Sequence, residues 1–193
     1  GPMTPVMRPM NERWFEADVV VDGSPSMVVW HRVVREFLDL LAQQGAFADV
    51  RRWTLSLADA GLALRSPSGV PRRPGELKDP AARRLIFVLT DGVGEAWRED
   101  GLPRVLANWA RTTPVVIVQM LPERLWPRTA IGVPSAAVWS PVPGVANAAM
   151  MIERPWGDQD DDAPVIPIVP ITLEAASIQR WAKALMGAAV TAP

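Results

Sequence analysis

The chain of 193 residues contains no cysteine, no tyrosine and a single histidine, His31. The absence of cysteine excludes disulfides, thiolate catalysis and cysteine–zinc sites. Because the chain has a single histidine, it has few candidate general bases, and a Ser-His-Asp mechanism would depend entirely on His31. We interpret His31, which lies early in an expected helix, as a structural residue.

A large net charge and long apolar runs are lacking as well. The formal net charge is −1, which gives no sign of the strongly basic balance of nucleic-acid binders. No apolar run approaches the ~20 residues that a membrane-spanning helix needs, and no signal peptide precedes the first expected strand. We therefore expect a cytoplasmic protein that binds neither nucleic acid nor membranes. All basic residues except Lys78 and Lys183 are arginine, a bias typical of a GC-rich bacterial genome.

The length is enough for one domain with a sizeable core. We expect this domain to span residues 16–188. Residues 1–15 are expected to hold a protease scar, Gly1-Pro2, followed by an N-terminal arm, and residues 189–193 a C-terminal tail.

Apolar patterning predicts strands that alternate with helices. The expected strands are 17–21, 49–57, 61–65, 85–90, 114–120, 136–140 and 165–171, and the expected helices are 27–44, 102–111 and 173–186, with a very short helix from residue 79. Residues 121–134 are expected to form a long loop, and the acidic run 158–162 a solvated one. The alternation predicts an α/β fold in three Rossmann-like layers: a mostly parallel central sheet with one antiparallel hairpin strand, and helices on both faces.

Two short runs carry the candidate chemistry, Val19–Ser26 (VVVDGSPS) and Leu85–Gly92 (LIFVLTDG). Each is a β-branched strand of the buried, parallel type that ends in an aspartate, Asp22 or Asp91. In open α/β sheets, ligands bind at the carboxyl ends of strands where the strand order reverses. The D-x-S-x-S spacing adds the hydroxyls of Ser24 and Ser26 on the same side of the loop. Two carboxylates and two hydroxyls form a cluster of hard oxygen ligands suited to Mg²⁺ or Mn²⁺.

These residues resemble the metal-ion-dependent adhesion site of von Willebrand factor A domains. Most of the chain is similar to the divergent A-like domains at the N-termini of large bacterial multidomain proteins, through VVVDGSPSM, RRLIFVLTDGVGEAW, LPERLWPRT and PIVPITLEAASIQRWAKALMG. The resemblance implies that Ser24 and Ser26 are inner ligands and that Asp22 and Asp91 are anionic supports. It also implies that a carboxylate of a partner protein completes the coordination shell, within a bacterial signalling or defence assembly.

One departure from the family pattern concerns its third metal motif, a loop threonine. No threonine lies between Leu55 and Leu89, and only Ser66 and Ser68 offer hydroxyls in the corresponding loop. Either one of these serines substitutes, or the site is incomplete. For partner binding, we expect Gly23 and Gly92 beside the site and Trp97 and Trp126 as an aromatic rim, because tryptophan is enriched at binding hot spots.

Several alternatives remain open. Ser26 can simply be the N-cap of a helix, Asp91-Gly92 a common turn pair, and Trp97, Trp126 and Trp156 can pack under loops. The leading functional hypothesis is a non-enzymatic protein-interaction module. One alternative is a metal-dependent phosphohydrolase with Asp22 as nucleophile; the other is a structural A-like domain that binds partners without metal.

Overall fold

A computed structural model describes residues 15–58, 61–79, 81, 83–98, 101–133, 137–153 and 166–187. Residues 1–14 of the expected arm, the acidic run 158–162, Trp156 and the tail at 189–193 lie outside these ranges, whereas Phe15, expected in the arm, begins the first strand. Within them the chain forms a seven-stranded sheet and a separate two-stranded one.

The seven-stranded sheet has the order β4-β3-β2-β1-β5-β6-β9. Its strands are β1 (Phe15–Asp22), β2 (Phe47–Ala58), β3 (Gly61–Arg65), β4 (Pro71–Arg72), β5 (Arg84–Thr90), β6 (Val115–Gln119) and β9 (Pro170–Ile171). Strands β2, β1, β5, β6 and β9 are parallel, whereas β3 is antiparallel to β2 and β4 to β3. The expected hairpin and mostly parallel sheet are therefore confirmed, with an additional short edge strand, β4.

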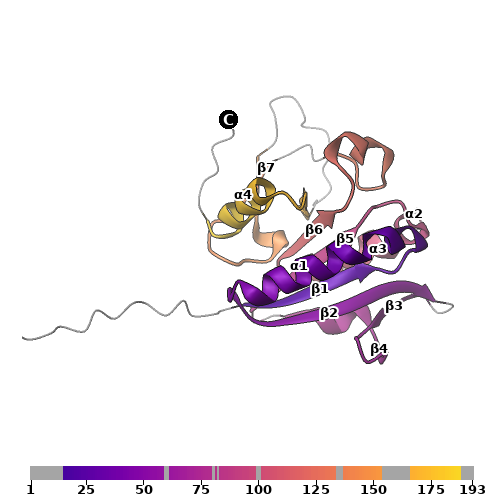
Figure 1. Cartoon of the computed structure of the whole chain (residues 1–193). Helices are drawn as coiled ribbons and strands as arrows, with labels where there is room; N and C mark the ends of the chain where they lie inside the picture. Colours follow the sequence, from indigo (N-terminus) through magenta and orange to yellow (C-terminus); the bar gives the residue numbers. More distant parts are fainter. Residues whose placement is uncertain are drawn as a thin grey trace, which may run out of the picture.

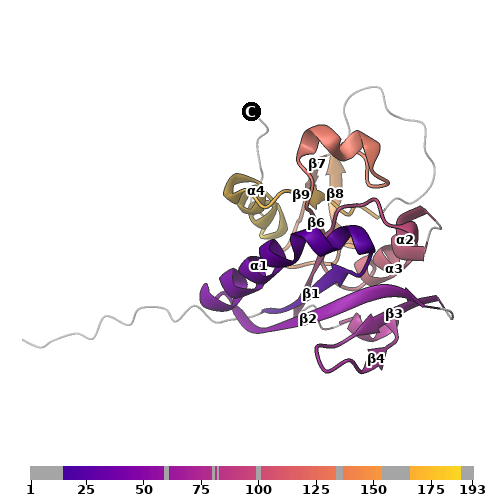
Figure 2. The ribbon, with the colours of Figure 1, turned by 45° about the vertical axis from the view of Figure 1, so that its right-hand side comes forward.

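Helices cover both faces of this sheet (Figures 1 and 2). α1 (His31–Gln43) and α4 (Ala175–Leu185) pack on one face, where Phe37 and Trp181 both meet the ring of Phe87 edge-on. α3 (Gly101–Ala110) packs on the other face, with Leu106 and Trp109 in its core. The three layers follow from the strand sequences, because strands that are apolar on both faces need cover on both.

The chain reverses direction across the sheet at β1. From β1 it passes through α1 to β2 and continues outward to β3 and β4; it then returns to β5 on the other side of β1 and continues outward through α3 to β6. The carboxyl ends of β1 and β5 therefore flank the point where strand order reverses, which is the usual ligand-binding position in such sheets.

Several expected boundaries were wrong. The helix expected over 27–44 begins as a 3-10 helix, η1 (Pro25–Trp30), and becomes α1 only at His31. No helix follows Asp79 in the described residues; its carboxylate instead accepts hydrogen bonds from the backbone N–H groups of Ala81 and Arg83. The last strand is reduced to the two residues of β9, although its expected place at the sheet edge is confirmed.

Other elements were not expected at all. α2 (Glu95–Arg98), η2 (Pro74–Leu77), η3 (Glu123–Arg128) and η4 (Asn147–Ala149) are short turns of helix within expected loops. The strand expected at 136–140 is β7 (Ala137–Trp139), which pairs with β8 (Met151–Glu153) in the small sheet and not with the central one.

Candidate metal and partner site at the carboxyl edge

The two strand-end aspartates belong to neighbouring parallel strands. β1 and β5 pair in a register that sets Val21 opposite Leu89, so Asp22 and Asp91 both leave the sheet at its carboxyl edge. Both residues are buried, with 4% and 3% of their surface exposed. The sequence-based expectation that these strand ends meet is therefore confirmed at the level of the backbone.

The carboxylate of Asp22 is held by four protein donors. Its Oδ1 accepts hydrogen bonds from the backbone N–H of Ser24 at 2.9 Å and from the Ser24 hydroxyl at 2.5 Å. Its Oδ2 accepts from Thr90 Oγ1 at 2.7 Å and from Trp97 Nε1 at 3.2 Å. Because Ser24 donates its only hydroxyl proton to Asp22, the lone pairs of Ser24 Oγ remain available to an electron-pair acceptor.

Hydrogen bonds from side chains and from the backbone also hold the loop that follows β5. Thr90 Oγ1 accepts from the backbone N–H of Gly92 at 3.0 Å and from Trp97 Nε1 at 2.9 Å. Asp91 Oδ1 accepts from the backbone N–H of Val93 at 3.2 Å, a single weak partner. Among the described residues, the Asp91 carboxylate has no side-chain donor, so it is less engaged than the Asp22 carboxylate.

Ser26 differs from Ser24 in having no partner. Its Oγ is buried, and no hydrogen bond to it is found among the described residues. A buried hydroxyl left without a partner costs about 1–3 kcal/mol. The N-cap interpretation of this serine is wrong, because η1 starts at Pro25 and its N-cap, Ser24, makes no side-chain capping bond.

Gly94 brings the loop after β5 against the D-x-S-x-S loop. A Cβ at this position would lie 1.9 Å from Ser24 Oγ and 2.8 Å from Ser24 Cβ. Position 92 also favours glycine, because its φ of +69° lies in the left-handed region. The backbone of Gly94 therefore packs against the side chain of Ser24, at a place where a side chain on residue 94 would push the two loops apart.

The structure does not bring Ser66 and Ser68 to this cluster. They follow β3, which lies two strands from β1 and runs away from the carboxyl edge, and Arg65 pairs opposite Thr54. Their hydroxyls bond to each other at 2.7 Å on the surface. The antiparallel hairpin explains this placement, because a strand that returns across the sheet carries its following loop away from the site.

The expected aromatic rim is also absent. Trp97 is 6% exposed and Trp126 is 4% exposed, and the indole N–H of Trp126 donates to the carbonyl of Leu121 at 2.8 Å. The expectation of exposed tryptophans was wrong because α2 and η3 turn both rings inward. Exposed aliphatic side chains lie on the segments that follow β1 and β5 instead, at Val28 in η1 (66% exposed) and at Val93 in the loop after β5 (37%).

The expected glycines differ in their surroundings. Gly23 is exposed, and its backbone N–H donates to the carbonyl of Leu55 at 2.7 Å. Gly92 is buried, and a Cβ there would lie 2.8 Å from Ile131. Of this pair, only Gly23 is open to a partner.

Sequence reasoning missed Gly94 and Gln119, and it missed the role of Trp97 as a donor to Asp22. Gln119 ends β6, donates to the carbonyl of Asp91 at 3.2 Å and accepts from the backbone N–H of Leu121 at 3.0 Å. A polar residue at the end of an apolar strand was the available signal. Gly94 gave none, because a glycine in a loop fits many turn conformations.

A separate ionic cluster lies in the body of the sheet, on the same face of β1 as Asp22. Asp18 is fully buried and pairs with Arg51 at 3.1 Å, while Trp53 Nε1 donates to it at 2.8 Å. Burial raises the pKa of Asp18 above its ordinary value; the Trp53 hydrogen bond and the Arg51 and Arg84 guanidinium groups oppose that shift. Glu16 completes this cluster through its ion pairs to both arginines.

Within the described ranges, no three His, Cys, Asp or Glu side chains are grouped as they would be around a metal ion. The Asp22 cluster has only two carboxylates and depends on hydroxyls for the rest. None of the described helices is long and apolar enough to cross a membrane. No family model, curated protein or solved structure matches the chain.

Proposed function

We propose that the chain is a non-enzymatic protein-interaction module in which a divalent cation, Mg²⁺ or Mn²⁺, links the Asp22–Asp91 cluster to a carboxylate of a partner protein. The observation that carries this proposal is the Ser26 hydroxyl, which lies two residues after Ser24 in the chain and is buried without a hydrogen-bond partner among the described residues. A bound cation would supply the missing partner, because a hydroxyl oxygen is a suitable ligand for a hard cation.

The donor set of this chain fits such an ion. Ser24 Oγ and Ser26 Oγ would bind it, and Asp91 would support it directly or through water. Asp22 would act mainly through its charge and by orienting Ser24, since both of its oxygens already accept hydrogen bonds. The two carboxylates offset the unfavourable effect of placing a cation near the start of η1.

The resemblance to von Willebrand factor A domains supports the same proposal. It suggests that the open coordination position takes an acidic side chain, and that the module works within a larger cytoplasmic bacterial signalling or defence assembly. The sheet topology is compatible with this assignment, because the candidate site lies where the strand order reverses.

A thermal-shift experiment tests the metal site. The wild type, Ser26→Ala and the control Ser68→Ala are melted in Mg²⁺, in Mn²⁺ and in chelator. At a cation concentration a hundredfold above Kd, binding stabilises the fold by about 2.7 kcal/mol, or roughly 5–10 °C at about 2–4 °C per kcal/mol. We expect this shift in the wild type and in Ser68→Ala, and its loss in Ser26→Ala.

The variants also separate a folding defect from a binding defect. In chelator, Ser26→Ala should be at least as stable as the wild type, because the substitution removes an unpaired buried hydroxyl. A wild type that does not respond to either cation, or a Ser26→Ala variant that responds as the wild type does, would contradict the proposal.

One observation favours a second candidate, a module that binds its partner without metal. All four hydrogen bonds to Asp22 come from the protein itself, so its charge is well solvated without an ion. Partner binding that is unchanged in chelator would support this candidate. The same four bonds argue against Asp22 as the nucleophile of a phosphohydrolase, because each carboxylate oxygen is already engaged by two donors. Phosphoester turnover that disappears in Asp22→Asn would restore that alternative.

A further inference from the structure

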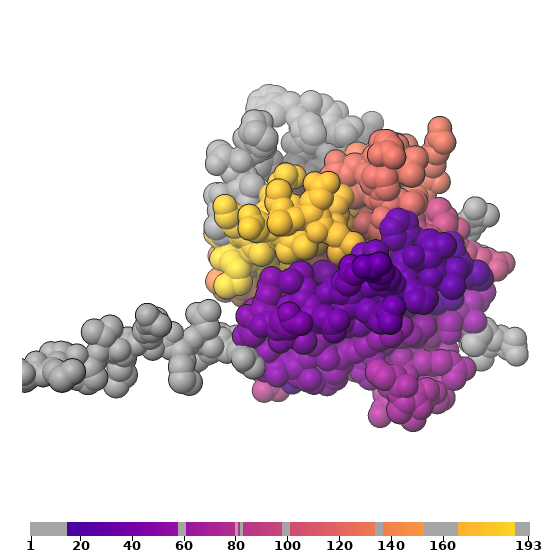
Figure 3. All heavy atoms as spheres, in the orientation of Figure 1, coloured from indigo at the N-terminus to yellow at the C-terminus, as the bar shows by residue number. Residues whose placement is uncertain are grey.

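A groove lies beside the candidate site, at the carboxyl ends of β6 and β9. Its volume is about 510 Å³. One wall is the start of η3, with Glu123 and Arg124, and the other is the segment between β9 and α4, with Thr172 and Glu174. On the surface, the segments of the two walls meet above α1, η3 in coral and the α4 segment in yellow (Figure 3).

Gln119 connects the wall of the groove to the Asp22–Asp91 cluster. This side chain lines the groove and also donates to the carbonyl of Asp91. β6 and β9 are the next two strands after β5, and neighbouring strands lie about 4.8 Å apart. The groove therefore lies within roughly 10 Å of Asp91 along the sheet edge.

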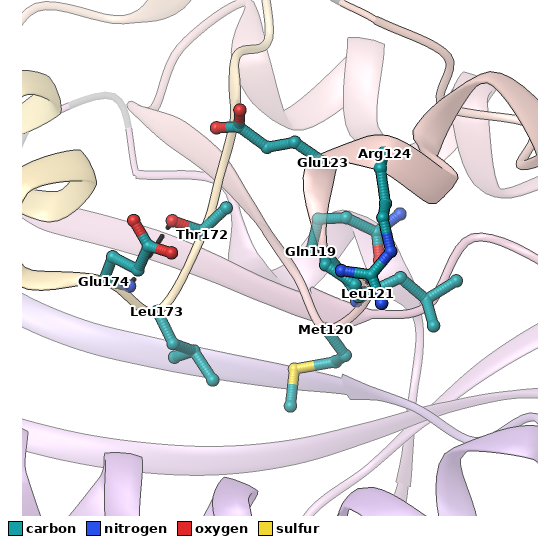
Figure 4. A pocket seen from close by; sticks show the side chains of 9 residues that line it. Gln119, Met120, Leu121, Glu123, Arg124, Thr172, Leu173 and Glu174 are labelled. Atoms are coloured by element: carbon teal, nitrogen blue, oxygen red, sulfur yellow. Dashed lines mark hydrogen bonds between the residues drawn. The ribbon is translucent and has the colours of Figure 1, made fainter.

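The floor of the groove is apolar, and charged side chains of both signs lie at separate places on its rim. Met120 is 6% exposed, and Leu173 packs against the same core cluster. In the view of Figure 4, the side chain of Arg124 lies on the same side as Gln119 and Leu121, whereas Glu123 points away from Arg124, toward the segment that carries Glu174. No ion pair among the described residues involves any of these three charged side chains.

We infer that this groove binds an extended segment of the partner protein that carries an acidic, an apolar and a basic residue at alternate positions. This inference rests on the proposed function, since the acidic residue is the one that reaches the cation. The apolar residue covers Met120 and Leu173, and the basic residue lies between Glu123 and Glu174, one from each wall.

The spacing follows from strand geometry. In an extended segment, residues i, i+2 and i+4 point to the same side and span about 13 Å at roughly 3.3 Å per residue. That length exceeds the roughly 10 Å that separate β5 from β9, the strand that precedes Glu174, along the sheet edge. The order of charges also fixes the direction of the segment, because reversing it would place the partner's basic residue beside the cation and Arg124.

Three capped peptides test this inference in Mg²⁺, by chemical-shift titration of the labelled protein. The first is Asp-Ala-Leu-Ala-Arg, the second replaces its arginine with alanine, and the third is the reversed sequence. An ion pair of partly exposed groups contributes about 0.2–1 kcal/mol, so two glutamates should make the first peptide bind about twofold to thirtyfold more tightly than the second. The reversed peptide should bind more weakly than either.

Variants assign the effect to the groove. Glu123→Gln combined with Glu174→Gln should abolish the preference for arginine without changing the affinity for the second peptide. The control is Asp39→Asn, an exposed carboxylate on α1 in no ion pair with a described residue; it should leave the preference intact.

The outcomes separate this inference from the proposed function. Equal binding of the first two peptides, or a preference for arginine that survives in the glutamine variant, would overturn the inference and leave the metal site standing. Failure of every peptide to bind in a protein that Mg²⁺ stabilises would also overturn it. A protein with neither a Mg²⁺ response nor peptide binding would overturn both.

Discussion

Replacement of Gly94 by alanine tests the contact between the two loops of the candidate site. The new Cβ would lie 1.9 Å from Ser24 Oγ and 2.8 Å from Ser24 Cβ, both closer than real Cβ contacts allow. Rotation of the Ser24 hydroxyl relieves only the first clash, and it breaks the bond to Asp22 Oδ1. The second clash requires a backbone shift in one of the loops.

The magnitude is the sum of these two effects. Loss of a hydrogen bond to a charged acceptor costs about 1.5–3 kcal/mol, and overpacking of a tight contact costs about 1–3 kcal/mol. We expect Gly94→Ala to lower the free energy of unfolding by about 2.5–6 kcal/mol, which corresponds to a decrease in Tm of roughly 5–24 °C. The variant should also lose the stabilisation by Mg²⁺, because Ser24 can no longer keep its position.

Denaturant unfolding measures the change, and Gly75→Ala provides the matched control. A methyl group on Gly75 would meet no atom within 4 Å, so this substitution should change stability by no more than about 0.5 kcal/mol. A Gly94→Ala variant within about 1 kcal/mol of the wild type, with its Mg²⁺ response intact, would show that the two loops are not in close contact.

Three further substitutions test other parts of the structure. Trp97→Phe keeps a six-membered aromatic ring but removes the pyrrole part of the buried indole, with the N–H that donates to Asp22 and Thr90. We expect a loss of about 1–3 kcal/mol in denaturant unfolding, and no loss would show that these bonds are unimportant. Asp18→Asn removes a carboxyl group that has a raised pKa because it is buried. The stability of the wild type relative to this variant should be greatest below the ordinary pKa of aspartate, and it should fall as the pH rises through the raised pKa of Asp18. A stability difference that grows with pH would contradict that direction. Asn147→Ala leaves the backbone N–H and C=O of Val115 and one further carbonyl without a partner; we expect a loss of about 2–4 kcal/mol in denaturant unfolding, and a decrease below about 1 kcal/mol would indicate that water replaces the amide.

The strand framework could be predicted from the sequence because the strands are apolar on both faces. β5 and β6 contain little except β-branched and large aliphatic residues, and this pattern identifies buried parallel strands without knowledge of tertiary contacts. The same reasoning predicted that Asp22 and Asp91 meet, since each of them lies at the end of a strand of this type.

The short elements and the contacts between loops could not be predicted. α2 and η3 span four and six residues, too few for a periodic pattern, and their burial of Trp97 and Trp126 depends on tertiary packing. The displacement of Ser66 and Ser68 depends on the direction of β3. The hairpin itself was expected, but its consequence for the following loop was not recognised.

Whether this edge of the sheet holds a cation can be decided by an anomalous difference map from crystals grown with Mn²⁺. We expect a peak between Ser24 Oγ, Ser26 Oγ and the Asp91 carboxylate, and no peak at that position in Ser26→Ala crystals. Wild-type crystals without density there, in Mn²⁺ well above the Kd from thermal shifts, would contradict the proposed metal site.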